Sequence, residues 1–214
     1  VYDDPAKIAI TISSVLKGMY TSTHLEKEEM YREEFIIQAI ENISIMLKEM
    51  YPKMNDGKIP NLEDLLKMLT NFDLVEKMCE IMKTDEILAE KYSSQIRYFK
   101  KNFYSNSSAR KDTEKDIYIA VAQLDNLLRL PGVKSILCNR HNNIDFDRAL
   151  ENGEVTLLCT RRGDLGRSTH KAFGLFFILS MQNAVLRRRG NENSRIPHFL
   201  YIDEFPDFIC KDTE

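Results

Sequence analysis

The chain has 214 residues, of which 43% are hydrophobic and 29% are charged, and it contains only 8 Gly and 6 Pro. This composition is typical of a globular protein with one or two domains, and it excludes a collagen-like or a largely disordered chain. The formal net charge is −3 at pH 7, which excludes a surface that is basic throughout and coats nucleic acid. Residues 1–109 carry 14 Lys and Arg against 18 Asp and Glu, whereas residues 110–214 carry 16 against 15, so we expect anion binding in the second half.

The four cysteines are too far apart in the sequence to form a C-x-x-C metal or redox motif. Cys138 and Cys159 fall in apolar runs, which favours strand-like segments with core thiols in a reducing, cytosolic compartment. No apolar run approaches the roughly 20 residues that span a bilayer. Because the chain begins V-Y-D-D-P, without Met or a signal-peptide pattern, and ends soon after its most motif-like stretch, we expect a fragment of a longer protein.

Residues 3–104 are predicted to form consecutive helices, because apolar residues recur there at every third or fourth position. Asp4 and Pro5 favour a helix start, Asn61 and Asn71 are predicted N-caps, and Thr84 is predicted to begin a further helix. The predicted helices span approximately residues 5–19, 25–51, 62–69, 72–82, 84–104 and, after a polar break at 105–108, 112–130.

After Pro131 the sequence pattern changes. Residues 155–159 and 198–202 are predicted strands, and the helix predicted between them, over residues 168–189, has a centre that is apolar on every side. A strand, a helix and a strand in this order predict a parallel βαβ unit. The predicted fold class is therefore α/β overall but mostly α, with an all-α domain over residues 1–108 and a partial α/β domain over residues 109–214.

Two acidic residues, Asp203 and Glu204, come directly after the apolar run F-L-Y-I. Ligands of α/β sheets bind at the carboxyl ends of the strands, so this spacing directs two carboxylates to a ligand site. In nucleotide hydrolases the arrangement is the Walker B motif, in which the Asp holds Mg²⁺ through water and the adjacent Glu orients and deprotonates the attacking water. The alternative is a solvated turn at the end of a strand.

Three segments carry a family resemblance. Residues 155–159 (V-T-L-L-C), the helix over residues 171–189 and residues 199–205 (F-L-Y-I-D-E-F) resemble the RecA-like motor domain of TraG/TraD-type coupling proteins. These are the ATPases of type IV secretion and conjugation in the FtsK/HerA translocase superfamily. The D-E-F triplet is similar to that family's version of Walker B, and residues 3–104 stand where the family inserts an all-helical domain.

The resemblance implies a hexameric, ATP-driven translocase that moves DNA or protein substrates, such as a relaxase–DNA complex, toward a secretion channel. It implies that Glu204 is catalytic, that Asp203 holds the metal, and that ATP and Mg²⁺ are cofactors of the intact parent protein. The helical domain would receive substrate in the cytoplasm, at the inner face of the cell membrane, together with other components of the secretion system.

One departure from the family pattern limits what this chain does alone. It contains no G-x-x-x-x-G-K-[ST] loop, and the segment 162–167 has neither that spacing nor the Lys. Without the loop, no backbone amides cradle the phosphates and no Lys neutralises them. We therefore expect the chain by itself to bind ATP poorly and to hydrolyse none.

Two groups of arginines are further candidates. Arg161, Arg162 and Arg167 follow the first predicted strand and are candidate contacts for phosphate or for a neighbouring subunit's nucleotide, with a solvated loop as the alternative. Arg187, Arg188 and Arg189 end the long helix and are candidate contacts for DNA phosphates, with the helix dipole as the alternative partner of their charge.

Three other functions stay open from the sequence. The first is an assembly ATPase of the same secretion system, and the second is a DNA-end-processing translocase of the HerA type. The third is a non-enzymatic helical adaptor, in which Asp203 and Glu204 are incidental.

Overall fold

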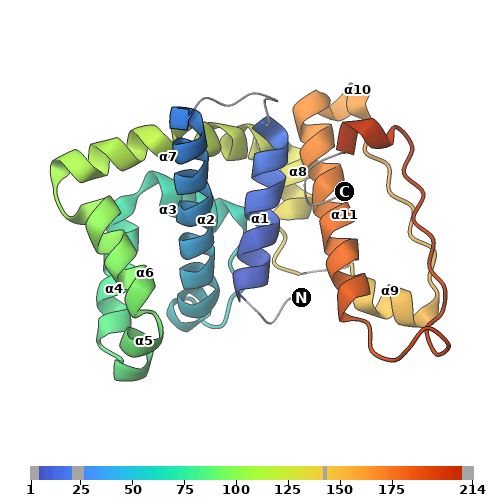
Figure 1. Cartoon of the computed structure of the whole chain (residues 1–214), viewed down its shortest axis with the longest axis horizontal. Helices are drawn as coiled ribbons and strands as arrows, with labels where there is room; N and C mark the ends of the chain where they lie inside the picture. The colour runs from blue at the N-terminus through green and yellow to red at the C-terminus, as the bar shows by residue number, and fades with distance from the viewer. Residues whose placement is uncertain (1–4, 21–26, 142–143, 209–214) are drawn as a thin grey trace. The chain divides into compact units, whose positions relative to one another are not determined.

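The computed structural model describes residues 5–20, 27–141 and 144–208, and it divides them into two compact units (Figure 1). Unit 2 holds residues 27–140 together with residues 5–13. Unit 1 holds residues 141–208 together with residues 14–20. The first helix, α1 (Pro5–Tyr20), contributes to both units, and we describe each unit by itself.

Unit 2 is all-helical over its described residues. Its further elements are α2 (Lys27–Met54), α3 (Leu62–Thr70), α4 (Phe72–Lys83), α5 (Glu86–Lys91), α6 (Ser93–Phe99), the π-helical segment η1 (Lys100–Tyr104), α7 (Ser107–Leu128) and α8 (Pro131–Leu137). The predicted helical array is therefore confirmed.

The predicted caps of α3 and α4 are confirmed. The Asn61 side chain accepts hydrogen bonds from the backbone N–H groups of Glu63 and Asp64, and the Asp64 carboxylate accepts from the Asn61 N–H in return. This reciprocal capping box satisfies N–H groups that the first turn leaves free. The Asn71 side chain accepts from the Asp73 N–H at the start of α4.

The core of unit 2 is built from the predicted apolar faces and closes around three aromatic rings. Phe72, Phe99 and Phe103 are at most 1% exposed. The rings of Phe72 and Phe103 have centroids 4.4 Å apart, and those of Phe99 and Phe103 meet edge to face at 5.1 Å. Such pairs add stabilisation to the burial of their area, so this end of unit 2 is tightly packed.

Several helix boundaries differ from the prediction. Thr84 is the C-cap of α4, and Asp85 caps the next helix instead, because its carboxylate accepts from two backbone N–H groups. The single helix predicted from Thr84 onward is divided into α5, α6 and η1. Helix α7 begins at Ser107, behind an Asn106 cap, rather than near residue 112. The cap predicted at Asp4 lies outside the described residues.

The two-unit division differs in position from the predicted boundary between residues 108 and 109. That boundary falls near the start of α7, whose Ile117, Ala120 and Leu124 are buried. The helical unit continues instead to Arg140. The apolar run at residues 133–138 is mostly helical, in α8, because Pro131 suits the first turn of a helix and Leu130 precedes it in an extended conformation.

Unit 1 contains α9 (Phe146–Asn152), α10 (Arg162–Leu165), α11 (Arg167–Arg187) and the 3₁₀ helix η2 (Phe205–Phe208). Helix α11 confirms the predicted helix, and its centre is largely buried, including Ala172, Phe173 and Leu175. Helix α9 is capped by Asp145, whose carboxylate accepts from the Arg148 N–H, and it is followed by Gly153 in the left-handed region.

The two predicted strands are wrong for the described chain, in which residues 154–160 and 196–202 form no strand. Figure 1 shows both as extended segments. At one end, Ile196 Cγ2 is 3.4 Å from the position that a Cβ on Gly153 would take; at the other end, Arg162 is paired with Asp207. The first residues of the two segments are therefore close together, and so are the residues that follow their last residues. The two segments thus run in the same direction, and α11 lies between them in the sequence.

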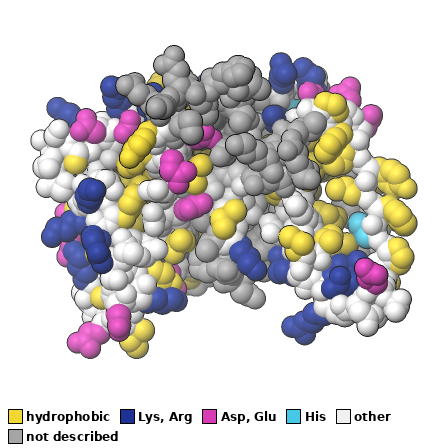
Figure 2. All heavy atoms as spheres, viewed as in Figure 1, with side chains coloured by type: hydrophobic (Ala, Val, Ile, Leu, Met, Phe, Trp, Pro, Cys, Tyr) yellow, Lys and Arg dark blue, Asp and Glu magenta, His cyan; other side chains and the backbone are white. Residues whose placement is uncertain are grey.

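The physical reason for the missing strands is that the two segments lack cover. Val155 is 87% exposed, Leu157 is 91% exposed and Tyr201 is 88% exposed, and Figure 2 shows hydrophobic side chains along this part of unit 1. Parallel strands form in sheets whose two faces are both buried, whereas the side chains of these two segments are exposed. Cys159 is also exposed and Cys138 is only half-buried, so the prediction of two strand-borne core thiols is wrong.

Candidate functional site

The acidic pair predicted from the sequence lies in a sharp turn between the second extended segment and η2. Both side chains are exposed. The Asp203 carboxylate accepts a hydrogen bond from the Glu204 N–H at 3.0 Å, and the Glu204 carbonyl accepts from the Asp207 N–H at 2.9 Å. Glu204 has a φ of +52°, a left-handed conformation that is uncommon for residues other than Gly. The turn therefore presents two adjacent carboxylates to solvent on a constrained backbone.

The turn is anchored to α11 through the aromatic ring of Phe208. A Cβ atom on Gly174 would lie 2.2 Å from Cε1 of Phe208, so only Gly at this position leaves room for the ring. The ring also lies against the imidazole of His170, with centroids 4.9 Å apart. The Nδ1 atom of His170 is in turn hydrogen-bonded to the carbonyl of Thr160, at the end of the first extended segment. The ends of both segments are thereby tied to the first half of α11.

Two of the first three candidate arginines lie in or beside α10, which the structure connects to this turn. Arg162 Nη1 is 3.1 Å from Asp207 Oδ2 in η2, across 45 positions of sequence. Arg161 pairs with Asp164 inside its own turn, at 3.3 Å, and remains largely exposed. Arg167 begins α11 and is exposed. The structure therefore brings Arg162 to the segment that carries the acidic pair.

The second arginine group lies at the other end of α11. Arg187 donates to both carboxylate oxygens of Asp147 in α9, at 2.7 and 3.0 Å. Arg188 donates to the carbonyl of Ile196 at 2.8 Å, and Arg189 is exposed. Since α11 has 21 residues, these arginines are about 30 Å from its beginning. The structure does not bring the two arginine groups together.

The residues present fit a magnesium ion that keeps most of its water. Exposed carboxylates such as Asp203 and Glu204 are the hard oxygen ligands that Mg²⁺ prefers, and Mg²⁺ is commonly bound by only one or two of them. Over the described chain, no group of three or more His, Cys, Asp or Glu side chains is placed to hold a metal. The residues do not fit a phosphate cradle, because residues 162–165 form the short α10 and segment 162–167 carries no Lys.

Sequence reasoning missed the residues that hold the site together. Asp207, His170 and Gly174 tie η2 to α10 and α11, and Asp147 is the partner of Arg187. No local sequence pattern predicts any of these contacts, because each joins residues that are far apart in the sequence. Only the proximity of Asp207 to the acidic pair was a possible signal.

No family model, curated protein or solved structure matches this chain. Among the described helices, none has the length and apolar character needed to cross a membrane. The assignment of function therefore depends on the site itself and on the resemblance noted in the sequence.

Proposed function

We propose that this chain is part of an ATP-driven translocase of type IV secretion or conjugation, to which it contributes the substrate-receiving helical unit and the Walker B part of a RecA-like motor. The observation that carries the proposal is the exposed Asp203–Glu204 turn. It follows an extended apolar segment that runs parallel to residues 154–160, and the buried helix α11 connects the two segments. This is the chain path of a βαβ unit with an acidic pair at its carboxyl end.

The roles of the side chains follow from their chemistry. Asp203 would hold Mg²⁺ through water, and Glu204 would orient the attacking water and take its proton. Bound ATP would supply the phosphoanhydride bond whose cleavage drives transport. Among the described residues, Arg162, held beside the turn by Asp207, is well placed to meet developing negative charge there.

The exposed apolar segments also support the proposal. Val155, Leu157, Phe199 and Tyr201 are each more than 70% exposed, which is unusual for four large apolar side chains on two neighbouring segments. In a complete motor these segments would be strands of a larger parallel sheet with helices on both faces. The phosphate-binding loop would come from residues outside this chain, and the intact protein would work as a hexamer at the inner face of the cell membrane.

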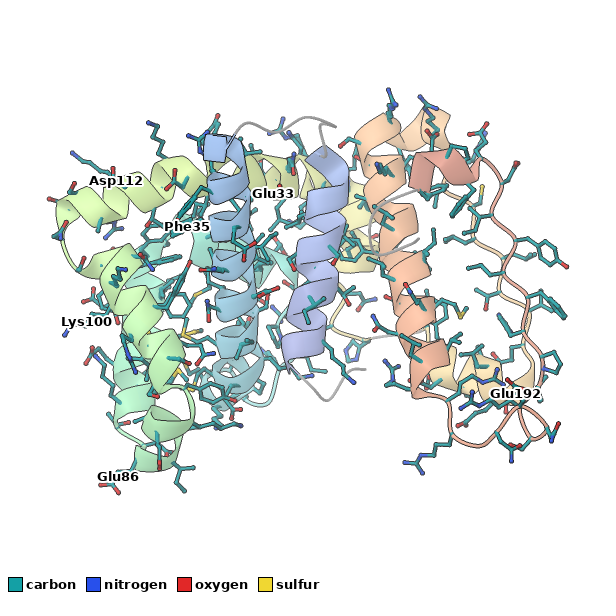
Figure 3. The ribbon with its side chains drawn as sticks, viewed as in Figure 1. Glu33, Phe35, Glu86, Lys100, Asp112 and Glu192 are labelled. Carbon is teal, nitrogen blue, oxygen red and sulfur yellow. The ribbon has the colours of Figure 1, made fainter. Side chains whose placement is uncertain are left out.

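The test measures ATP hydrolysis by the complete gene product that contains this chain. We expect Glu204→Gln to abolish turnover while ATP binding is retained, because the amide cannot accept the proton. The matched control is Glu192→Gln, which makes the same change on an exposed residue near the far end of α11, labelled in Figure 3. Near-normal hydrolysis by the Glu204→Gln variant would exclude the Walker B assignment.

A non-enzymatic helical adaptor is a second candidate, and the closed aromatic core of unit 2 favours it, because that unit packs around side chains of its own. The two candidates differ in their need for nucleotide. If the complete gene product binds no Mg²⁺–ATP and Glu204→Gln leaves substrate transfer unchanged, the adaptor is the better account.

A further inference from the structure

A surface pocket in unit 2 is independent of the acidic turn. It has a volume of about 430 Å³ and lies between α2, α6 and the π-helical segment η1. That volume is within the range of small-ligand sites. We call it the basic pocket, and the lining residues used below are Phe35, Gln38, Ser94, Arg97, Tyr98 and Lys101.

The apolar part of the pocket is rigid. Phe35 and Tyr98 are half-buried, with ring centroids 6.3 Å apart. Tyr98 also contacts the buried rings of Phe99 and Phe103, at 5.5 and 6.0 Å. Because these core rings are fully buried, the Tyr98 ring is fixed from below and offers a preformed apolar surface.

The polar part of the pocket is basic. Arg97 and Lys101 are exposed, four positions apart, and no acidic side chain lines the pocket. Within the described part of the chain, neither Arg97 nor Lys101 forms an ion pair. Glu34, which precedes the lining residue Phe35 on α2, accepts a hydrogen bond of 3.5 Å from Gln38 and is not paired with either of them. Figure 3 labels the neighbouring Lys100, and Figure 2 shows Lys and Arg side chains gathered over this part of unit 2.

Two local features are typical of a binding site. The segment Lys100–Tyr104 is π-helical. This conformation is rare in proteins, and where it occurs it is often at a functional site. The Tyr98 hydroxyl is shielded from solvent and has no hydrogen-bond partner among the described residues. Burial raises the pKa of Tyr98, so this hydroxyl stays a neutral donor. A buried donor without an acceptor is costly, so this hydroxyl is one of the few unsatisfied polar groups beside the pocket.

We propose that the basic pocket binds an acidic peptide segment of a protein partner, with a carboxylate between Arg97 and Lys101 and a neighbouring apolar side chain on the rings of Phe35 and Tyr98. The partner that we propose is a transported protein substrate, and this choice of partner rests on the proposed function. A short acidic peptide fits better than a nucleic acid, because residues 1–109 carry four more acidic than basic side chains and their long-range repulsion grows with the number of charges on the ligand. A short peptide carries few negative charges, whereas a phosphate backbone carries one for every nucleotide.

The test is a titration of the full chain, without nucleotide, with the probe acetyl-Asp-Phe-Glu-Leu-amide, followed by two-dimensional NMR. We expect saturable binding that maps to the basic pocket and weakens with salt. The neutral probe acetyl-Asn-Phe-Gln-Leu-amide is expected to bind at least about tenfold more weakly, since two charge-assisted contacts are together worth about 1.4 kcal/mol or more. A short oligo-dT serves as the nucleic-acid comparison.

Three variants locate the binding. Arg97→Gln combined with Lys101→Gln is expected to weaken the acidic probe at least about tenfold. Lys58→Gln combined with Lys77→Gln makes the same charge change on exposed lysines away from the pocket and is expected to change affinity less than about twofold. Ser94→Trp fills the pocket without changing charge and is expected to abolish binding; circular dichroism confirms that each variant is folded.

Four results would overturn this inference: no saturable binding of the acidic probe up to millimolar concentration, equal binding of the neutral probe, unchanged affinity in the Arg97–Lys101 double variant, or preferential binding of oligo-dT at the pocket. Each of them leaves the motor assignment intact, because the titration involves no nucleotide and Glu204 takes no part in it. Conversely, full ATPase activity in the Glu204→Gln variant would refute the motor and leave peptide binding to stand.

Discussion

Arg140, the last residue of unit 2, forms a partly buried cluster whose loss has a calculable cost. Its Nη2 atom donates to Asp64 Oδ2 at 2.8 Å and to the Tyr51 hydroxyl at 2.9 Å, and its Nη1 atom donates to the Ile59 carbonyl. The side chain of Asp64 is only 5% exposed, so Arg140 neutralises an otherwise buried carboxylate. The cluster joins the end of α2 and the start of α3 to the C-terminal end of unit 2.

The perturbation is Arg140→Met, which keeps the apolar part of the side chain and removes the guanidinium. Removing one partner of a buried ion pair costs about 3–5 kcal/mol. We expect about 2–3 kcal/mol here, because Arg140 is 31% exposed and the Asp64 carboxylate keeps the Asn61 N–H at 3.0 Å and the Lys67 ammonium at 3.7 Å.

The assay is urea unfolding followed by circular dichroism, in a double-mutant cycle with Asp64→Asn. The two substitutions are expected to couple by about 1–2 kcal/mol, since each removes the same interaction. The control is Lys134→Met, which breaks the half-exposed pair of Lys134 and Glu63, 2.6 Å apart, and is expected to destabilise the protein much less than Arg140→Met, because solvent screens this pair. An Arg140→Met variant as stable as the Lys134→Met variant, or a coupling near zero, would refute this reasoning.

Two further predictions concern one residue in each unit. Gly174→Ala is expected to destabilise the seat of Phe208 by about 1–3 kcal/mol and to speed hydrogen exchange in η2, because the added Cβ overlaps the ring. Glu49 accepts hydrogen bonds from Lys53 and from the Tyr92 hydroxyl, which lower its pKa to about 2. Because the folded pKa is below the ordinary value of 4.5, the stabilisation is present above about pH 4.5 and is lost as the pH falls toward 2. With allowance for solvent screening, we expect the wild type to lose about 1–2 kcal/mol more than Glu49→Gln over that range, measured by urea unfolding at each pH.

Each of these predictions has a matched control. Gly163→Ala adds a Cβ where no atom lies within 4 Å and is expected to leave η2 unchanged. Equal exchange rates in both alanine variants would contradict the packing argument. Glu90→Gln removes an exposed carboxylate from α5 and is expected to leave the acid limb of the stability curve as in the wild type. If Glu49→Gln gives that same curve, its hydrogen bonds contribute nothing to the pH dependence.

Local signals predicted the helices of unit 2 well. Asn61 and Asn71 cap the helices that follow them, and the stripe at Leu88, Tyr92 and Phe99 is buried as its spacing indicates. Caps and helical periodicity act within one or two turns, so they can be recognised in a single sequence. The choice of Asp85 over Thr84 as a cap was not predictable, because both are good capping residues and adjacent.

The strand prediction failed for a different reason. Residues 155–159 and 198–202 have the composition of buried strands. Composition shows only that a segment favours the strand conformation, and it does not show which segments pair with it or cover it. Over the described chain, nothing covers Val155, Leu157 or Tyr201, so no strand forms there. Whether such a run becomes a strand depends on the neighbouring segments, which its own residues do not specify.

By itself the sequence determined the helical character of unit 2, the long buried helix α11 and the position of two adjacent carboxylates after an apolar run. Only the tertiary structure decided that Arg162 lies beside that acidic pair through Asp207 and that Gly174 makes room for Phe208. It also decided that Arg187 is held by Asp147 of α9 and that Arg188 is held by Ile196 in the loop that follows α11. The physical reason is range. Capping and periodicity involve residues a few positions apart, whereas these ion pairs and ring contacts join residues between 34 and 45 positions apart, or across a loop, and exist only once the chain has folded.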